Sequence, residues 1–255
     1  FAESHANLGN ILSDRGKLEE AEISLRKAIE QKPDLLEANV QLGALLSDLG
    51  KIKEANIYEW RAIEIETSSP FIKSYRDNAS LINKTAFFVF GLNIFNHFKP
   101  IIEINPDLFE IVVKDDIDKI TIMKIRNYLN NKEIKIRTTK ELIDKKLIYE
   151  KLVSVRGDLW SDIIEYKNNI PRPIKVPYIK LLGKKNIRYM YTAGKNRYTI
   201  YSYWNKYYDG VLCYGPFHEE RFKIKHQIAT SQMGYPRFDK YFSPGFERDY
   251  LLEKF

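Results

Sequence analysis

The sequence repeats itself near its amino terminus with a period of 34 residues. The recurring residues are small or apolar: Leu8-Gly9, Leu12, Gly16, Ala21 and Ala28 return as Leu42-Gly43, Leu46, Gly50, Ala55 and Ala62. A period of this size predicts a stack of helical hairpins, because each copy buries its apolar face against the next. We expect Gly9 and Ala21 to let the two helices of one copy approach closely, and Ala28 to leave room for the following copy.

The spacing and residue types resemble the tetratricopeptide repeat (TPR), a helix-turn-helix unit of this length. The resemblance implies a groove that binds a peptide or protein partner. The second copy departs from the first at Glu59, which stands where the first copy has Leu25, as expected of a terminal repeat that faces something other than a repeat. Two copies are fewer than the roughly three that a stable stack needs. We therefore expect support from upstream repeats or from the segment that follows.

Charge divides the chain into two parts. Residues 1–68 hold 8 Lys/Arg and 13 Asp/Glu, which leaves 33 of the 41 basic and 21 of the 34 acidic residues for the remainder. The two parts are expected to present different surfaces to different partners. The single cysteine, Cys213, lies in an apolar run, so we expect a buried thiol and a reducing compartment.

Other sequence features indicate where the protein is located and whether the chain is complete. The sequence has no run of about 18 apolar residues and no signal-peptide profile. We expect a soluble, cytoplasmic protein. It opens on Phe1 and stops at Phe255 within helical patterns, which indicates a fragment of a longer chain.

The hydrophobic period changes after the repeats. Apolar residues three or four apart from Phe71 to Ile82 predict a capping helix that continues to about Lys84. Short apolar runs then alternate with helical patterns. We expect strands at 86–90, 108–113, 134–136, 151–155 and 187–191, and helices at 94–104, 119–130 and from Thr139. This alternation predicts a doubly wound parallel sheet. The stretch 157–183 is expected to lack a regular helix because it contains three prolines.

A strand-helix-strand unit is predicted near the carboxyl terminus. Apolar residues 211–214 predict a strand, Pro216 a helix start, and 228–233 a second strand. The loop at residues 234–239, Gly-Tyr-Pro-Arg-Phe-Asp, follows that strand. Ligands of parallel sheets bind outside the carboxyl ends of the strands, so this loop is a candidate binding site. The alternative is a tight turn in which Arg237 and Asp239 pair with neighbouring backbone.

Residues 234–239, with the preceding strand and the Gly-Pro-Phe-His-Glu turn at 215–219, resemble a segment of CDP-glycerol glycerophosphotransferase-like proteins. These are GT-B-type enzymes with two Rossmann-like domains facing each other across a cleft, and some build cell-envelope polysaccharides. The resemblance covers residues 86–242 in organisation and 209–242 in motif. It implies a division of the chain into repeats at 1–68, a capping helix at 69–85, an acceptor-side domain at 86–242 and the start of a linker at 243–255.

The resemblance also implies a set of ligands. A CDP- or UDP-linked donor would bind a nucleotide-binding domain beyond Phe255, so this fragment alone would be inactive and hold no cofactor. A glycan or polyol-phosphate acceptor would be steered by basic and aromatic side chains, with Asp239 fixing Arg237. The binding residues implied are Lys195, Arg197, Tyr235, Arg237 and Asp239. Contact with the inner face of a membrane would be peripheral at most.

One departure from the family pattern bears on catalysis. The family carries a His-Gly-x-x-x-Lys motif whose histidine is a base toward the acceptor, whereas this chain has Ala193 before Gly194. Either the mechanism has changed or the domain binds without catalysing. The rival hypothesis is therefore a non-catalytic TPR scaffold for protein partners. His218 is a candidate general base, because imidazole titrates near neutrality. The alternative is a histidine on a helix surface.

Cations and aromatic residues interleave between Lys184 and Lys206. Such a cluster suits a phosphate-bearing or sugar ligand. Alternatives are a solvated basic face and, less favoured, single-stranded nucleic acid. The sequence shows neither metal-ligand spacing of His and Cys nor a Gly-x-x-x-x-Gly-Lys-Ser/Thr phosphate loop, so no metal site is predicted.

Overall fold

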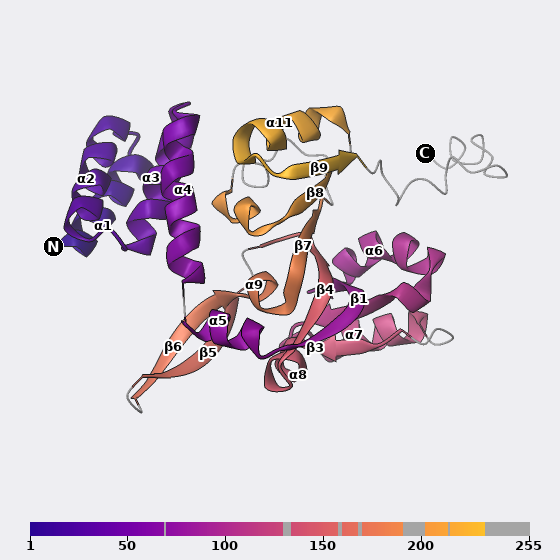
Figure 1. The fold of residues 1–255 in the computed structure, drawn as a ribbon. Coiled ribbons are helices and arrows are strands. Elements are labelled where there is room, and N and C mark those ends of the chain that lie inside the picture. Colours follow the sequence, from indigo (N-terminus) through magenta and orange to yellow (C-terminus); the bar gives the residue numbers. More distant parts are fainter. Residues whose placement is uncertain are drawn as a thin grey trace.

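The computed structural model describes residues 1–68, 70–129, 134–157, 160–167, 170–190, 202–213 and 215–232. The chain begins with two helical hairpins, which Figure 1 shows at one end of the molecule. Their helices are α1 (Ala2–Asp14), α2 (Leu18–Gln31), α3 (Leu36–Asp48) and α4 (Ile52–Thr67). The predicted pair of repeats is therefore present, with one hairpin in each copy.

The repeated glycines have two packing roles. A Cβ on Gly9 would lie 2.6 Å from Cγ of Leu25, so only glycine lets α1 approach α2 this closely. Gly16 and Gly50 both have φ of +76° in the turns between helices, where an L side chain would be strained. Alanine and leucine side chains fill the space between the hairpins, which explains why small residues recur at a fixed spacing.

The segment after the repeats is a shorter helix than the sequence predicts. Helix α5 (Pro70–Asp77) ends well before Lys84, and strand β1 (Ser80–Val89) begins inside the stretch expected to be helical. The amide of Ser80 already donates to Lys146 O at 2.8 Å. Pairing with a neighbouring strand thus overrides the helical spacing of the apolar residues.

The second part of the chain is built on a single seven-stranded sheet. Its strands run in the order β3-β2-β1-β4-β7-β8-β9, and every pair of neighbours is parallel. The strands after β1 are β2 (Phe109–Val113), β3 (Ile136–Thr138), β4 (Leu147–Ser154), β7 (Gly183–Tyr189), β8 (Gly210–Cys213) and β9 (Ala229–Gln232). The fold is thus a TPR-like helical region followed by a Rossmann-like α/β sheet, as the sequence predicts.

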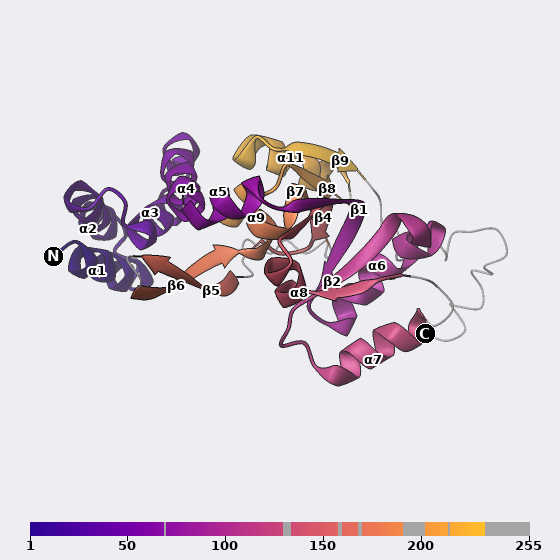
Figure 2. The ribbon, with the colours of Figure 1, turned by 60° about the horizontal axis from the view of Figure 1, so that its bottom comes forward.

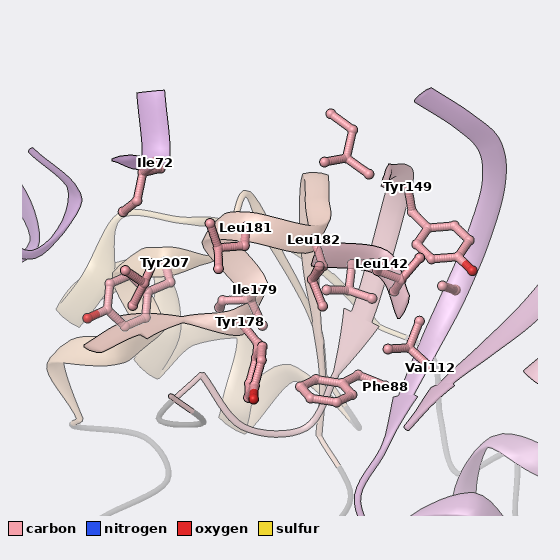
Figure 3. Packing of buried hydrophobic residues seen from close by; sticks show 14 of the residues in the cluster. Ile72, Phe88, Val112, Leu142, Tyr149, Tyr178, Ile179, Leu181, Leu182 and Tyr207 are labelled. Carbon is pink, nitrogen blue, oxygen red and sulfur yellow. The ribbon is translucent and has the colours of Figure 1, made fainter. Parts of the chain in front are cut away.

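Helices cover both faces of this sheet, as Figure 2 shows. Helices α6 (Leu92–Ile104) and α7 (Lys119–Tyr128) lie on the face that Phe87 and Val89 of β1 line. The alternate residue Phe88 faces the other side, where α8 (Thr139–Asp144) and α9 (Tyr178–Leu182) pack (Figure 3). There Phe88 meets Tyr178 edge to face at 5.7 Å between ring centroids. Helix α11 (Pro216–His226) packs on the same side, over β8.

A two-stranded antiparallel hairpin interrupts the parallel pattern. It consists of β5 (Trp160–Lys167) and β6 (Ile170–Pro177) and projects from the sheet unit in Figure 1. The hairpin was not predicted, and the expectation that 157–183 lacks a regular helix is wrong at the end of that stretch, because α9 (Tyr178–Leu182) starts directly after the last of the three prolines. The prolines lie in β6, an edge strand, where a missing N–H breaks no central ladder.

Local sequence signals locate most of the other helices correctly. Pro100 lies inside α6, which continues through it. Thr138 rather than Thr139 caps α8, since its Oγ1 accepts from the amide of Glu141 at 3.1 Å.

Cys213 is fully buried, and burial raises the pKa of its thiol to about 11. The predicted buried thiol is therefore confirmed.

Candidate functional site

The carboxyl edge of the parallel sheet is the place where ligands of such folds bind. The chain winds in opposite directions on either side of the boundary between β1 and β4, so a crevice is expected beyond the ends of these two strands. Gly91 follows β1, and Arg156 and Gly157 follow β4. The last strand, β9, ends at the same edge with Gln232.

Most of the site residues predicted from the sequence lie outside the described residues. They are Lys195, Arg197, Tyr235, Arg237 and Asp239. The described chain places the strand before the motif: β9 ends at Gln232, two residues before Gly234 in the sequence. These five assignments stay predictions.

His218 is neither on a helix surface nor open to solvent. Its side chain lies in the first turn of α11 and is 6% exposed. The ring of Phe217 meets it edge to face, with 5.4 Å between centroids. The alternative of a surface histidine is therefore wrong, because the helix turns this position toward the sheet. A catalytic role for His218 stays a prediction.

Glu219 fastens the start of α11 to β9. Its carboxylate accepts from Thr230 Oγ1 at 3.0 Å and Gln232 Nε2 at 2.6 Å, and pairs with Lys223 at 2.7 Å. The bond from Lys223, followed by those from Gln232 and Thr230, lowers the pKa of Glu219 to about 2. A carboxylate thus already occupies the end of α11 that a phosphate would otherwise favour.

The described members of the basic, aromatic-laced stretch do not form one surface. Lys184 lies at the amino end of β7 and pairs with Glu150 at 3.2 Å. Arg188 and Lys206 are buried, at 2% and 3% exposure. The expectation of a single ligand-binding face therefore does not hold for these residues, because strand alternation and burial separate them.

Arg188 instead anchors a buried polar network on the sheet face. Its guanidinium lies 4.5 Å from the ring centroid of Trp204 and 5.1 Å from that of Phe222, and its Nη1 donates to Oδ1 of Asn205. The Nδ2 of Asn205 is 3.3 Å from Nε2 of His226. Because an amide nitrogen only donates, Nε2 accepts, and the neutral imidazole carries its proton on Nδ1.

A buried ion-pair cluster lies next to this network and joins the two parts of the chain. Glu59 of α4 is 1% exposed, and its carboxylate lies 2.9 Å from Nζ of Lys225 and 3.5 Å from Nζ of Lys206. Lys206 also donates to Asn56 Oδ1 at 2.7 Å. Burial, opposed by Glu59 and reinforced by the ammonium of Lys225, lowers the pKa of Lys206.

A second contact lies at the end of α4. Glu66 is 7% exposed and accepts a hydrogen bond at 3.0 Å from the hydroxyl of Tyr203, in the 3-10 helix η2 (Tyr203–Tyr207). Burial, only partly offset by this bond, raises the pKa of Glu66 to about 7. We name the residues that join α4 to η2 and α11 the seam: Glu59, Glu66, Tyr203, Lys206 and Lys225.

The seam explains why the second repeat has Glu59 at the position where the first repeat has Leu25. The position that holds buried Leu25 in the first repeat faces lysines of the sheet unit in the second. Figure 1 shows α4 on the side of the repeats that is turned toward the sheet. Sequence reasoning assigned Lys206 to a ligand-binding face and missed Lys225, Asn205 and His226. The one available signal of the seam was the apolar-to-acidic change at Glu59.

Within the described ranges, no group of three or more His, Cys, Asp or Glu side chains is placed to hold a metal ion. None of the helices in these ranges has the length and apolar character of a membrane span.

Comparisons with known proteins identify the repeats. The family model for the tetratricopeptide repeat matches residues 2–35. No curated protein sequence matches the chain. A solved structure of a mutant O-GlcNAc transferase from Thermobaculum terrenum aligns with 92% of this chain and 51% of its own, at 14% identity and a TM-score of 0.32. The chain thus spans about half the length of that structure, and the score is too low to establish a shared fold. The first hairpin thus matches the tetratricopeptide repeat, and the 34-residue period relates the second hairpin to it.

Proposed function

We propose that the chain is the acceptor-side part of a TPR-containing transferase of the two-domain GT-B type. It would move a glycosyl or glycerophosphate group from a nucleotide-activated donor to a glycan or polyol-phosphate acceptor. The observation that carries this is the parallel strand order β3-β2-β1-β4-β7-β8-β9, because its last strand directly precedes the family-like sequence at 234–239. Ligands of such sheets bind beyond the carboxyl ends of the strands.

The basic residues predicted from the sequence would bind the acceptor. Arg237 suits a phosphate because its planar guanidinium donates two parallel hydrogen bonds, and Asp239 would hold it in position. Lys195 and Arg197 would add charge, and Tyr235 would cover the flat face of a sugar. The donor, CDP- or UDP-linked, would be bound by a domain that follows Phe255. The protein would work in the cytoplasm, at most peripherally at the membrane.

The repeats would place a protein partner relative to this site. The seam holds α4 against η2 and α11, so a peptide or protein in the TPR groove would sit at a fixed position relative to the sheet. In this arrangement the repeats select or localise the acceptor, and the sheet unit binds its reacting end.

The test is isothermal titration of the natural chain extended past Phe255 with CDP-glycerol and with UDP-linked sugars. We expect saturable binding of one donor class by the longer chain and no binding by residues 1–255. Transfer to a polyol-phosphate acceptor should fall in Arg237→Ala and stay unchanged in Arg126→Ala, an exposed arginine on α7. If the longer chain binds none of these donors, the proposal is wrong.

A second candidate is a TPR scaffold whose sheet unit does not catalyse. Ala193 favours it, since this residue stands where the resembled family has its catalytic histidine. Affinity capture from cells with the whole chain distinguishes the two. A scaffold retains the same protein partners when Arg237 is changed to Ala and shows no donor binding when the chain is extended.

A further inference from the structure

Helices α2 and α4 are the second helices of the two repeats, but three side chains on the outer face of α4 differ in charge from those at the same positions of α2. The changes are Glu19 to Lys53, Glu22 to Asn56 and Arg26 to Trp60. Two acidic positions are thus lost, and one basic position is gained while another is lost, so the net charge of these three positions changes from −1 to +1. All three changed residues of α4 line one cavity at the seam.

This cavity has a volume of about 210 Å³ and lies between α4, η2 and the end of α11. Four further residues complete its lining: Ile57, Lys206, His226 and Gln227. Among the described residues the wall therefore carries two amines, an imidazole, two amides and an indole, and no carboxylate. Cavities for drug-sized ligands are roughly 300–1,000 Å³, so this one fits a smaller molecule.

The charge around the cavity is unbalanced. Glu59 lies just behind the wall, and its single carboxylate is shared between Lys225 and Lys206. Lys53 adds a further, exposed ammonium on the wall. Three ammonium groups thus face one carboxylate. Two of them, those of Lys206 and Lys225, are buried, and burial together with the charge of Lys225 lowers the pKa of Lys206. An anion in the cavity would relieve this excess of positive charge.

The wall also offers oriented contacts. The Oδ1 of Asn56 accepts from Lys206, which leaves Nδ2 of Asn56 to donate toward a ligand. Trp60 is 49% exposed, and Nζ of Lys206 lies 5.1 Å from its ring centroid. The indole therefore provides a flat apolar face next to the cationic end.

We propose that the seam cavity binds a small phosphorylated molecule, with its phosphate between Lys53 and Lys206 and its body against Trp60. Such a ligand contacts α4 and η2 at the same time, so it binds the docked arrangement of the two parts and stabilises it by mass action. The site is separate from the carboxyl edge of the sheet and does not depend on the transferase proposal.

The test is isothermal titration of the whole chain with sodium phosphate and with glucose 1-phosphate, at constant ionic strength set with sodium chloride. We expect one saturable site. Lys53→Gln should weaken binding by roughly tenfold, the effect of one charge-assisted hydrogen bond. Lys27→Gln removes an exposed lysine of α2 that is remote from the cavity and should leave the affinity unchanged.

Fluorescence gives an independent readout. Ligand binding should change the emission of the wild-type chain, and Trp60→Phe should lose that change while it still binds phosphate. Glucose 1-phosphate should bind more tightly than phosphate, because its ring reaches the indole. The inference is overturned if phosphate gives no saturable signal, if Lys27→Gln weakens binding as much as Lys53→Gln, or if the sugar phosphate binds less tightly than phosphate.

Discussion

The carboxylate of Glu59 is the single group on which the junction between repeats and sheet most depends. It is 1% exposed and faces two lysines that are themselves 3% and 2% exposed. Glu59→Gln keeps the shape of the side chain and removes only the charge. Two ammonium groups would then be buried without a counter-charge, which is far more costly than the loss of an exposed ion pair.

The expected cost follows from this burial. Removing one partner of a buried ion pair costs about 3–5 kcal/mol, against a total stability of roughly 5–15 kcal/mol for a folded domain. Replacing both Glu59 by Gln and Lys225 by Met removes one of the two uncompensated ammonium groups, leaves that of Lys206, and should recover part of the loss. The two single changes should therefore be strongly non-additive in a double-mutant cycle.

The measurement is urea-induced unfolding of the whole chain, followed by far-ultraviolet circular dichroism. Glu64→Gln provides the matched control, because Glu64 is exposed on the same helix, and its free energy of unfolding should change by less than about 0.5 kcal/mol. A loss below about 1 kcal/mol in Glu59→Gln would refute the reasoning, since a buried, shared carboxylate should not be removed so cheaply.

Three further predictions concern Glu66, Arg188 and Cys213. The pKa of the Glu66 carboxyl is about 7 in the folded chain and 4.5 in the unfolded chain. The free energy of unfolding is therefore highest at low pH, where Glu66 is protonated, and this stability is lost as the pH rises through 7. Glu66→Gln should remove about 3 kcal/mol of this loss, measured by urea unfolding at about pH 5 and about pH 9. A Glu66→Gln variant with an unchanged pH profile would contradict this. Arg188→Lys should cost about 2 kcal/mol in thermal unfolding, because an ammonium does not stack between Trp204 and Phe222 as a guanidinium does; a cost near zero would count against the network. Cys213 should react with a thiol reagent only after unfolding, and fast labelling of the native chain would show that the strand is exposed.

Much of the fold can be predicted from local patterns. The 34-residue spacing of Gly9, Ala21 and their copies predicts the hairpins, because close helix packing demands small residues at fixed positions. Alternating apolar runs predict the parallel sheet, and Pro216 marks the start of α11 within the strand-helix-strand unit.

The features that escaped prediction depend on contacts between distant residues. The start of β1 at Ser80 is set by pairing with β4, which the helical spacing around Tyr75 conceals. The burial of Lys206 and Lys225 cannot be read from their own surroundings, since lysine is almost always exposed. Only Glu59, an acidic residue at a position that is apolar in the first repeat, carried a signal of the junction.

Native-state hydrogen exchange compares the two parts of the chain most directly, because it gives the opening free energy of each segment. We predict that amides in the middle of α4 and of β7 open with the same free energy in the wild-type chain, since the seam couples the repeats to the sheet so that both open together. In Glu59→Gln the α4 amides should open more easily than those of β7. Exchange of α4 that is already much easier than that of β7 in the wild type, and unchanged by Glu59→Gln, would contradict the claim that the repeats and the sheet form one body.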